Sequence, residues 1–233
     1  MSNKFPLAKI LILVTILAVP GFLYYLLQSK GENRYKPLPI FGPKEVAKTF
    51  TKKRGKKIPD TIFHVVKSFE ATNQNGDKVL IDSIKKQLIV VNFFYSRSKD
   101  IVPQMYTNIK WLNKEFKDNK IVRFLSISVD PEFDNQSVLG QYAKQYDAVS
   151  GKWDFLSADT SVVYSLAKKQ FFLNALEDKQ NDGFIHSEKL VLLDAEHRIR
   201  GYYDATSAPE VKKMGDEMKI LITEELRKIK AEF

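Results

Sequence analysis

Hydrophobic positions along this chain form one long uncharged run near the N-terminus and shorter, patterned segments further on. The run from Ile10 to Leu27 carries no charged residue and is apolar on all sides of a helix, and it is long enough to cross a bilayer. No small-residue cleavage site follows it, so the pattern favours a retained signal anchor over a removed signal peptide. We therefore expect residues 1–27 to be an N-terminal membrane anchor, with Ile10–Leu27 as its transmembrane helix.

The next segment, residues 28–57, has the composition of a linker. It contains Pro37, Pro39 and Pro43, and proline interrupts a helix because it lacks an amide donor and restricts the residue before it. The same segment holds ten basic residues against two acidic ones. We expect a basic, partly extended tether between the N-terminal helix and a domain that covers residues 58–233.

In that domain, buried strands alternate with amphipathic helices. Leu88–Tyr95 and Ile121–Val129 are almost continuously apolar and rich in β-branched and aromatic residues, as is typical of strands buried on both faces. Between them, apolar residues recur at helical spacing from Ile101 to Phe116, which indicates one buried helix face. Two buried strands joined by a helix predict a right-handed parallel crossover.

Two hairpins and a closing helix complete the pattern. An Asn-Gly pair at 75–76 is a strong turn signal between two β-rich segments, and residues 190–193 are placed to pair with residues 199–203. A capping box at 207–210 starts the last helix. This order predicts an α/β fold, a thioredoxin-like sheet with helices on both faces, preceded by one N-terminal transmembrane helix.

The chain contains no cysteine among its 233 residues. This excludes disulfides, thiolate metal sites, thiol–disulfide exchange and thiol-dependent peroxidase chemistry. A serine hydrolase would need a nucleophile elbow, and the Gly-x-Ser-x-Gly pattern is absent from the sequence. The histidines His64, His186 and His197 lie in separate segments, so a shared zinc site is not expected. We expect no enzymatic activity.

The formal net charge of +9 is concentrated in the linker, because residues 58–233 are close to neutral. A nucleic-acid-binding domain would carry its basic residues on the folded surface, so we expect no nucleic-acid partner. A basic segment beside a membrane helix typically contacts lipid headgroups.

Several segments carry a resemblance to a known family. They are Ala71-Thr-Asn-Gln-Asn-Gly-Asp, Val91-Asn-Phe-Phe-Tyr, Phe124-Leu-Ser-Ile-Ser-Val-Asp-Pro-Glu, His186-Ser187 and Arg198-Ile-Arg-Gly-Tyr-Tyr-Asp. From about residue 58 to 228 the chain resembles the SCO/SenC family, membrane-anchored thioredoxin-like proteins implicated in copper delivery to cytochrome c oxidase. The resemblance implies the membrane and respiratory-complex or assembly proteins as partners.

The resemblance also implies where a copper site would lie. The family binds copper through a Cys-x-x-x-Cys pair and a distant histidine, and these positions correspond to Ser98, Val102 and His186. Only His186 retains a family ligand. Cu(I) prefers soft sulfur ligands, a serine hydroxyl is a poor one, and valine has no lone pair. We therefore expect no cofactor.

Three interpretations of function remain. The first is a non-catalytic binding or assembly factor related to copper-site maturation in cytochrome c oxidase. The alternative is a copper carrier with a rearranged site that uses His186 together with Met105 or Asp130. A third is a small-molecule binding module that uses the vacated cleft.

Two signals disagree about the side of the membrane on which the domain lies. Lysine and arginine after the helix outnumber those before it, and the positive-inside rule then places the domain in the cytoplasm. The family resemblance implies an extracytoplasmic, periplasmic-side domain, and the rule weakens for long translocated domains. We expect the extracytoplasmic location.

Overall fold

The structure is a computed structural model that describes residues 7–30, 37–53, 56–99, 101–173, 176–178, 183–185 and 187–231. It divides into two units, residues 1–36 and 37–233. The first contains one helix, α1 (Leu7–Lys30), which includes Pro20. A helix is thus confirmed where the sequence predicts one. Across the described ranges, however, no helix combines the length and the apolarity that a membrane crossing requires, so the expected crossing is not confirmed.

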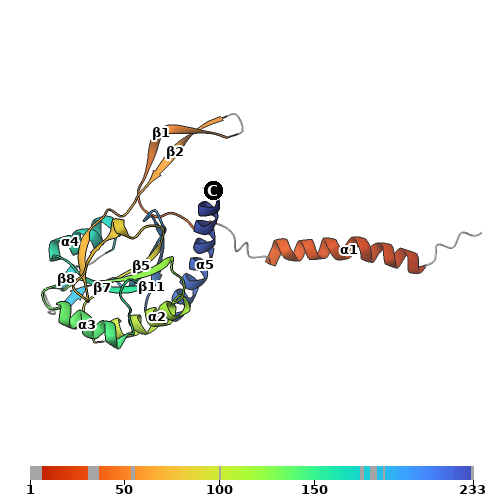
Figure 1. Cartoon of the computed structure of the whole chain (residues 1–233). Helices are drawn as coiled ribbons and strands as arrows, with labels where there is room; N and C mark the ends of the chain where they lie inside the picture. The colour runs from red at the N-terminus through yellow and green to blue at the C-terminus, as the bar shows by residue number, and fades with distance from the viewer. Residues whose placement is uncertain are drawn as a thin grey trace, which may run out of the picture. The chain divides into compact units, whose positions relative to one another are not determined.

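The second unit is built on a seven-stranded sheet (Figure 1). Its strands are β3 (Glu70–Asn73), β4 (Lys78–Leu80), β5 (Leu88–Phe94), β6 (Val122–Ser128), β7 (Trp153–Ser157), β10 (Lys189–Leu193) and β11 (Ile199–Asp204). The order across the sheet is β11-β10-β5-β6-β7-β3-β4. β5, β6 and β7 are parallel, and the outer strands pair antiparallel.

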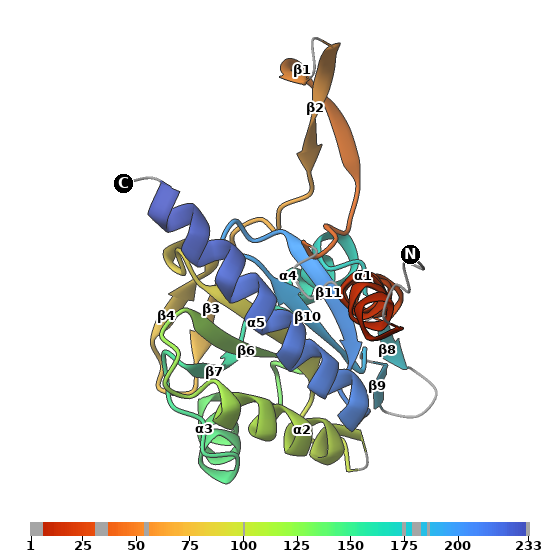
Figure 2. The same ribbon diagram turned by 90° about the vertical axis from the view of Figure 1, so that its right-hand side faces the viewer.

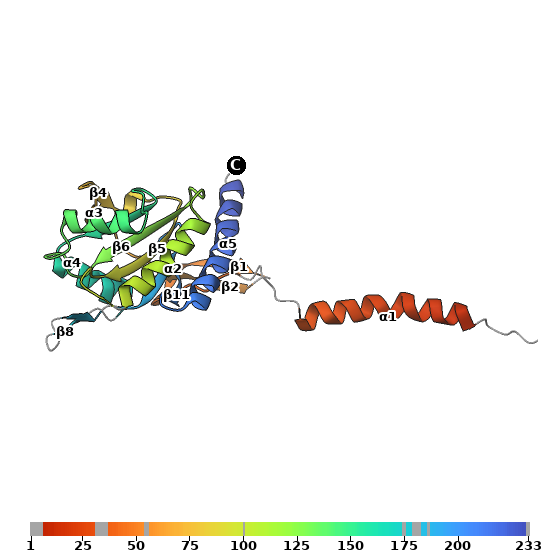
Figure 3. The ribbon, with the colours of Figure 1, turned by 90° about the horizontal axis from the view of Figure 1, so that it is seen from below.

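Helices cover both faces of this sheet (Figure 2). They are α2 (Ile101–Glu115), α3 (Gln136–Gln145), α4 (Thr160–Ser165) and α5 (Ala208–Ala231). One core cluster joins a face of the sheet to apolar residues of α2, α3 and α5. The other core cluster joins the opposite face to α4 and the π-helical turn Leu166–Gln170. In Figures 2 and 3, α2 and α5 lie side by side. The expected α/β sheet with helices on both faces is confirmed.

The central strands agree with the sequence patterns. Every residue of β5 is buried, because a strand in the middle of a sheet covered on both faces meets no solvent. β5 pairs in parallel with β6, with Val91 opposite Leu125, and α2 connects them as the predicted crossover. The hairpin around the Asn-Gly turn is β3–β4, and the 190–193/199–203 hairpin is β10–β11.

The segment expected to be an extended tether is partly folded. Residues Lys44–Lys53 and Lys56–Phe63 form an antiparallel pair, β1 and β2, which projects from the sheet domain in Figures 1 and 2. Before β1, Leu38 lies in the core, and Arg200 donates hydrogen bonds to the carbonyls of Leu38 and Pro39. The compact unit spans residues 37–233, and residues 37–43 belong to it because they pack against β11.

The sequence patterns do not predict three further strands. β7 extends the sheet beyond β6, and a small separate pair consists of β8 (Leu176–Asp178) and β9 (Gly183–Ile185). In Figure 2, β8 and β9 lie at one side of the sheet domain. β7 contains Trp153 and Phe155, both buried, with Asp154 between them.

Candidate functional site

The candidate site lies where β5 and β6 end and α2 begins. In open sheets with parallel strands, binding sites form beyond the carboxyl ends of the strands. Here the segment of residues 95–99 follows β5, and the turn of residues 129–135 follows β6. Ser98 and Val102 flank the start of α2, so both family positions lie at this edge.

Ser98 and Val102 have different environments. Ser98 is partly exposed, and its backbone amide donates to the carbonyl of Tyr95 over 3.2 Å. Val102 is 0% exposed and belongs to the same core cluster as Tyr106 and Phe94. The first turn of α2 is therefore anchored by an apolar side chain in the core.

An ion pair links the loop after β5 to the turn after β6. The guanidinium of Arg97 donates to Oδ2 of Asp130 from Nε (2.9 Å) and from a terminal nitrogen (2.5 Å). The guanidinium also lies 4.9 Å from the ring centre of Phe133, in cation–π range. Asp130 is nearly buried, so its carboxylate is already engaged by a cation.

A second carboxylate, Asp134, is fully buried beneath this ion pair. Ser128 donates its hydroxyl to Asp134 over 2.5 Å, and the hydroxyl and amide of Ser96 also donate to it. Burial raises the pKa of Asp134, because desolvation outweighs these donors. Tyr142 donates to the Ser96 carbonyl over 2.6 Å, and burial raises its pKa to about 12. The network fixes the loop of residues 95–98 to α3 and the turn after β6.

Sequence reasoning missed Arg97, Ser96, Ser128 and Asp134 as members of this edge. The segment Ser126-Ile-Ser-Val-Asp-Pro-Glu-Phe-Asp does place two serines and two aspartates at the end of an apolar strand. That spacing alone predicts polar groups at a strand end. It does not identify Arg97 as their partner, because Arg97 comes from another loop.

The remaining ligand candidates do not form a metal centre among the described residues. Met105 is 0% exposed in the core, so its sulfur is not accessible without repacking. His186 lies outside the described residues. His64 and His197 each place Nε2 near a different backbone carbonyl, that of Gln170 (2.9 Å) and that of Ile84 (3.0 Å).

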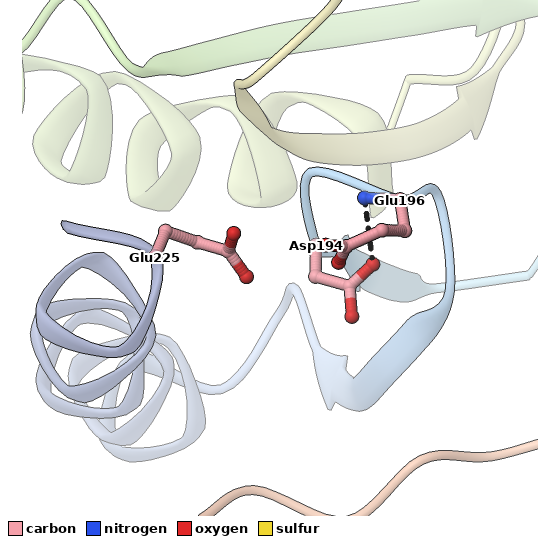
Figure 4. Close-up of side chains that lie close together, drawn as sticks. All are labelled: Asp194, Glu196 and Glu225. Atoms are coloured by element: carbon pink, nitrogen blue, oxygen red, sulfur yellow. Dashed lines mark hydrogen bonds between the residues drawn. The ribbon is translucent and has the colours of Figure 1, made fainter. Parts of the chain in front are cut away.

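A cluster of carboxylates lies elsewhere, at the β10–β11 turn and α5 (Figure 4). Oxygen atoms of Asp194, Glu196 and Glu225 lie within 4.8 Å of one another, and the Glu196 amide donates to Asp194 over 3.1 Å. These groups already pair with cations: Arg198 and Arg200 contact Asp194, and Lys228 contacts Glu196 and Glu225. The cluster is therefore an ion-pair network that joins α5 to the sheet.

A hollow of about 460 Å³ lies beside the candidate site. Pro131, Glu132, Gln136 and Asp159 are among its lining residues, so most of the functional groups it presents are polar. Asp130 directly precedes Pro131 of this lining, but neither Asp130 nor its partner Arg97 lines the hollow. Its volume would admit a small polar ligand, and its lining does not specify which one.

These features define a class of protein: a thioredoxin-like α/β domain in a chain that contains no cysteine. A family model described as SCO1/SenC matches residues 59–221. The chain belongs to the SCO1/SenC family.

Curated relatives extend the match over most of the chain. A SCO1 protein homolog of Bacillus subtilis is 29% identical over 152 residues, covering 64% of this chain and 79% of its own. A SCO2-like protein of Rickettsia typhi is 25% identical over 209 residues, covering 87% of this chain and 94% of its own.

Solved structures share the fold. A SCO1/SenC family lipoprotein of Bacillus anthracis matches with a TM-score of 0.62 at 23% identity, over 68% of this chain and 95% of that one. BsSco, described as a member of the Sco family of cytochrome c oxidase assembly proteins, matches with a TM-score of 0.59 at 27% identity, over 67% and 93%. Bradyrhizobium japonicum ScoI with copper bound matches with a TM-score of 0.54 at 23% identity, over 64% and 98%.

Proposed function

We propose that this protein is a non-catalytic assembly factor of the Sco family that acts in cytochrome c oxidase maturation without a thiolate copper site. Its work is binding: the domain presents a rigid surface to a respiratory complex or to another assembly protein. The family membership and the description of BsSco as one of the cytochrome c oxidase assembly proteins support the pathway.

One observation supports a mechanism that uses no thiolate copper site. Val102 is wholly buried in the core at the start of α2, and the neighbouring Asp130 is engaged by Arg97. An apolar group at that position contributes packing, and it cannot donate electrons to Cu(I). The loop is therefore held by packing and by the Arg97–Asp130 pair, where the family would use a metal or a disulfide.

Attachment to a membrane through the N-terminal segment is part of the same proposal, with the domain on the extracytoplasmic side. It is supported by the uncharged run Ile10–Leu27 in the sequence, by exposed apolar side chains on α1 such as Leu13 and Leu17, and by the B. anthracis relative being described as a lipoprotein. Deletion of residues 1–27 should release the protein from membranes washed at high salt. Retention of the truncated protein would overturn this attachment.

The functional test is genetic rescue in the source organism. Cells that lack the protein should contain less assembled cytochrome c oxidase, measured from its haem absorbance and oxygen consumption. The wild-type chain and the His186→Ala variant should restore the oxidase equally, because the proposal assigns no copper ligation to His186.

Two results would contradict this function. An unchanged oxidase level in cells without the protein would remove the link to oxidase assembly. Rescue by the wild type but not by His186→Ala, at equal protein level, would instead favour the copper-carrier alternative that uses His186.

A further inference from the structure

The β1–β2 hairpin exposes apolar side chains on a ribbon that contributes nothing to the core. Every residue of β1 and β2 whose side chain is described is exposed or half-exposed. Val46 is 77% exposed and Phe50 is 59% exposed. A two-stranded hairpin is at best marginally stable alone in water, so a ribbon that leaves such groups in solvent is suited to packing against another surface.

The strand register separates the side chains of the hairpin into two faces. Residues directly opposite in an antiparallel pair place their side chains on the same face. Val46 lies opposite Thr61, and Phe50 lies opposite Pro59. These four residues share one face with the pairs Lys44–Phe63 and Lys52–Lys57.

That face combines apolar and cationic groups and has no carboxylate among its paired residues. Lys44 lies at one end, with its Nζ atom 5.7 Å from the ring centre of Phe63, and Lys52 and Lys57 lie opposite each other near the turn. We call this face, defined by Lys44, Val46, Phe50, Lys52, Lys57, Pro59, Thr61 and Phe63, the basic face.

The opposite face differs in its charge. It carries Ile58 and Ile62, with Thr51 and Glu45 opposite them, and by alternation along β2 it also carries Asp60. Thr51 donates a hydrogen bond to Asp60, and this bond lowers the pKa of the carboxyl group. The pair Lys53–Lys56 also lies on this face, near the turn, so two lysines balance its two carboxylates. The basic face has three lysines and no carboxylate among its paired residues, and it therefore offers the stronger attraction to an anionic surface.

We propose that the basic face of the hairpin docks on an anionic lipid surface. Val46 and Phe50 would enter the boundary between headgroups and acyl chains, and the three lysines would reach the lipid phosphates along their flexible stems. Each lysine near an anionic leaflet adds attraction that salt screens. This contact goes beyond the proposed function, and it requires neither copper chemistry nor a membrane crossing by α1.

The absence of cysteine from the chain provides a clean test on the full-length protein. Thr61→Cys places a single label on the basic face, and Ile62→Cys places it on the opposite face one residue away. Each variant carries a polarity-sensitive dye and is mixed with vesicles of phosphatidylcholine alone or of phosphatidylcholine with phosphatidylglycerol. Both positions are exposed, so neither label disturbs the core.

We expect the label at 61 to report an apolar environment on the phosphatidylglycerol vesicles only, with a much smaller change at 62. Adding Lys44→Glu, Lys52→Glu and Lys57→Glu should reduce the fraction of protein bound to vesicles at least about tenfold, because each lysine contributes attraction to the anionic surface. High salt should also reduce the bound fraction. An equal response in both vesicle types would overturn the proposal. So would an equal change at 61 and 62.

Discussion

At the scale of single residues, Val102 shows how one buried side chain holds the start of a helix in place. It packs in the core at the first turn of α2. Position 98 keeps a small polar group that is partly exposed. A metal-binding loop must present its ligands to solvent or to a partner, whereas a buried valine stabilises the helix start against the core.

We predict that Val102→Ser lowers the free energy of unfolding by about 2–3 kcal/mol. The change removes buried methyl groups and leaves a hydroxyl in an apolar environment. Val149→Ser is the matched control, because Val149 is 67% exposed, and it should change stability by less than about 0.5 kcal/mol. Urea unfolding of both variants measures the difference, and equal effects would show that Val102 is not a core residue.

The buried Asp134 should make stability depend on pH. Because burial raises its pKa in the folded state, the folded protein holds this proton more tightly than the unfolded chain does. Its contribution to stability is therefore fully present below the ordinary pKa of 3.8 and is lost as the pH rises through the raised value.

Relative to Asp134→Asn, which has no proton to lose, the wild type should accordingly lose stability as the pH rises through that window. Thermal unfolding of the two proteins across the acid range measures the trend. Asp82→Asn, at an exposed position, serves as the control for general charge effects. A wild type that gains stability over Asp134→Asn with rising pH would contradict the raised pKa.

At the scale of elements, a close approach within β11 explains the glycine of the Arg-Gly-Tyr-Tyr-Asp segment. A Cβ atom added to Gly201 would overlap the phenol ring of Tyr203. Tyr203 is buried and donates to Glu217 of α5, and this contact ties the last helix to the edge of the sheet. The glycine therefore allows the contact between β11 and α5.

We predict that Gly201→Ala destabilises the protein by about 1–3 kcal/mol, because Tyr203 must leave its buried position. Gly140→Ala in α3 is the control. Its new Cβ would meet only the Gln74 carbonyl oxygen at an ordinary 3.8 Å, and alanine favours a helix by up to about 1 kcal/mol. Denaturant unfolding should thus move the two variants in opposite directions. Equal stabilities would refute the steric explanation.

The elements that sequence predicts well are those with a buried face. β5, β6 and α2 pack on the core, so their apolar residues follow the period of the strand or helix. β1 and β2 escape prediction because none of their side chains that the structure describes is buried, and their lysines mask the strand period. Arg97 and Asp130 escape it as a pair for another reason: they lie in different loops, and only the parallel pairing of β5 with β6 brings those loops together.

At the scale of the whole molecule, the chain combines the family fold with a sequence that contains no cysteine. Both core clusters, the seven-stranded sheet and the helices α2, α3, α4 and α5 on its two faces are present in residues 37–233. A fold does not by itself imply a function, and the chain has no thiolate to offer to copper. The proposed binding role accordingly needs the fold and no thiolate.

The most direct measurement is the copper content and Cu(I) affinity of the purified full-length protein, titrated against a chromophoric Cu(I) chelator. We predict that the wild type yields copper to the chelator, and that Ser98→Cys with Val102→Cys gains one tightly held Cu(I) per chain, since two thiolates then supply the soft ligands that Cu(I) prefers. A wild type that holds one copper per chain against the chelator would contradict a function without a copper site.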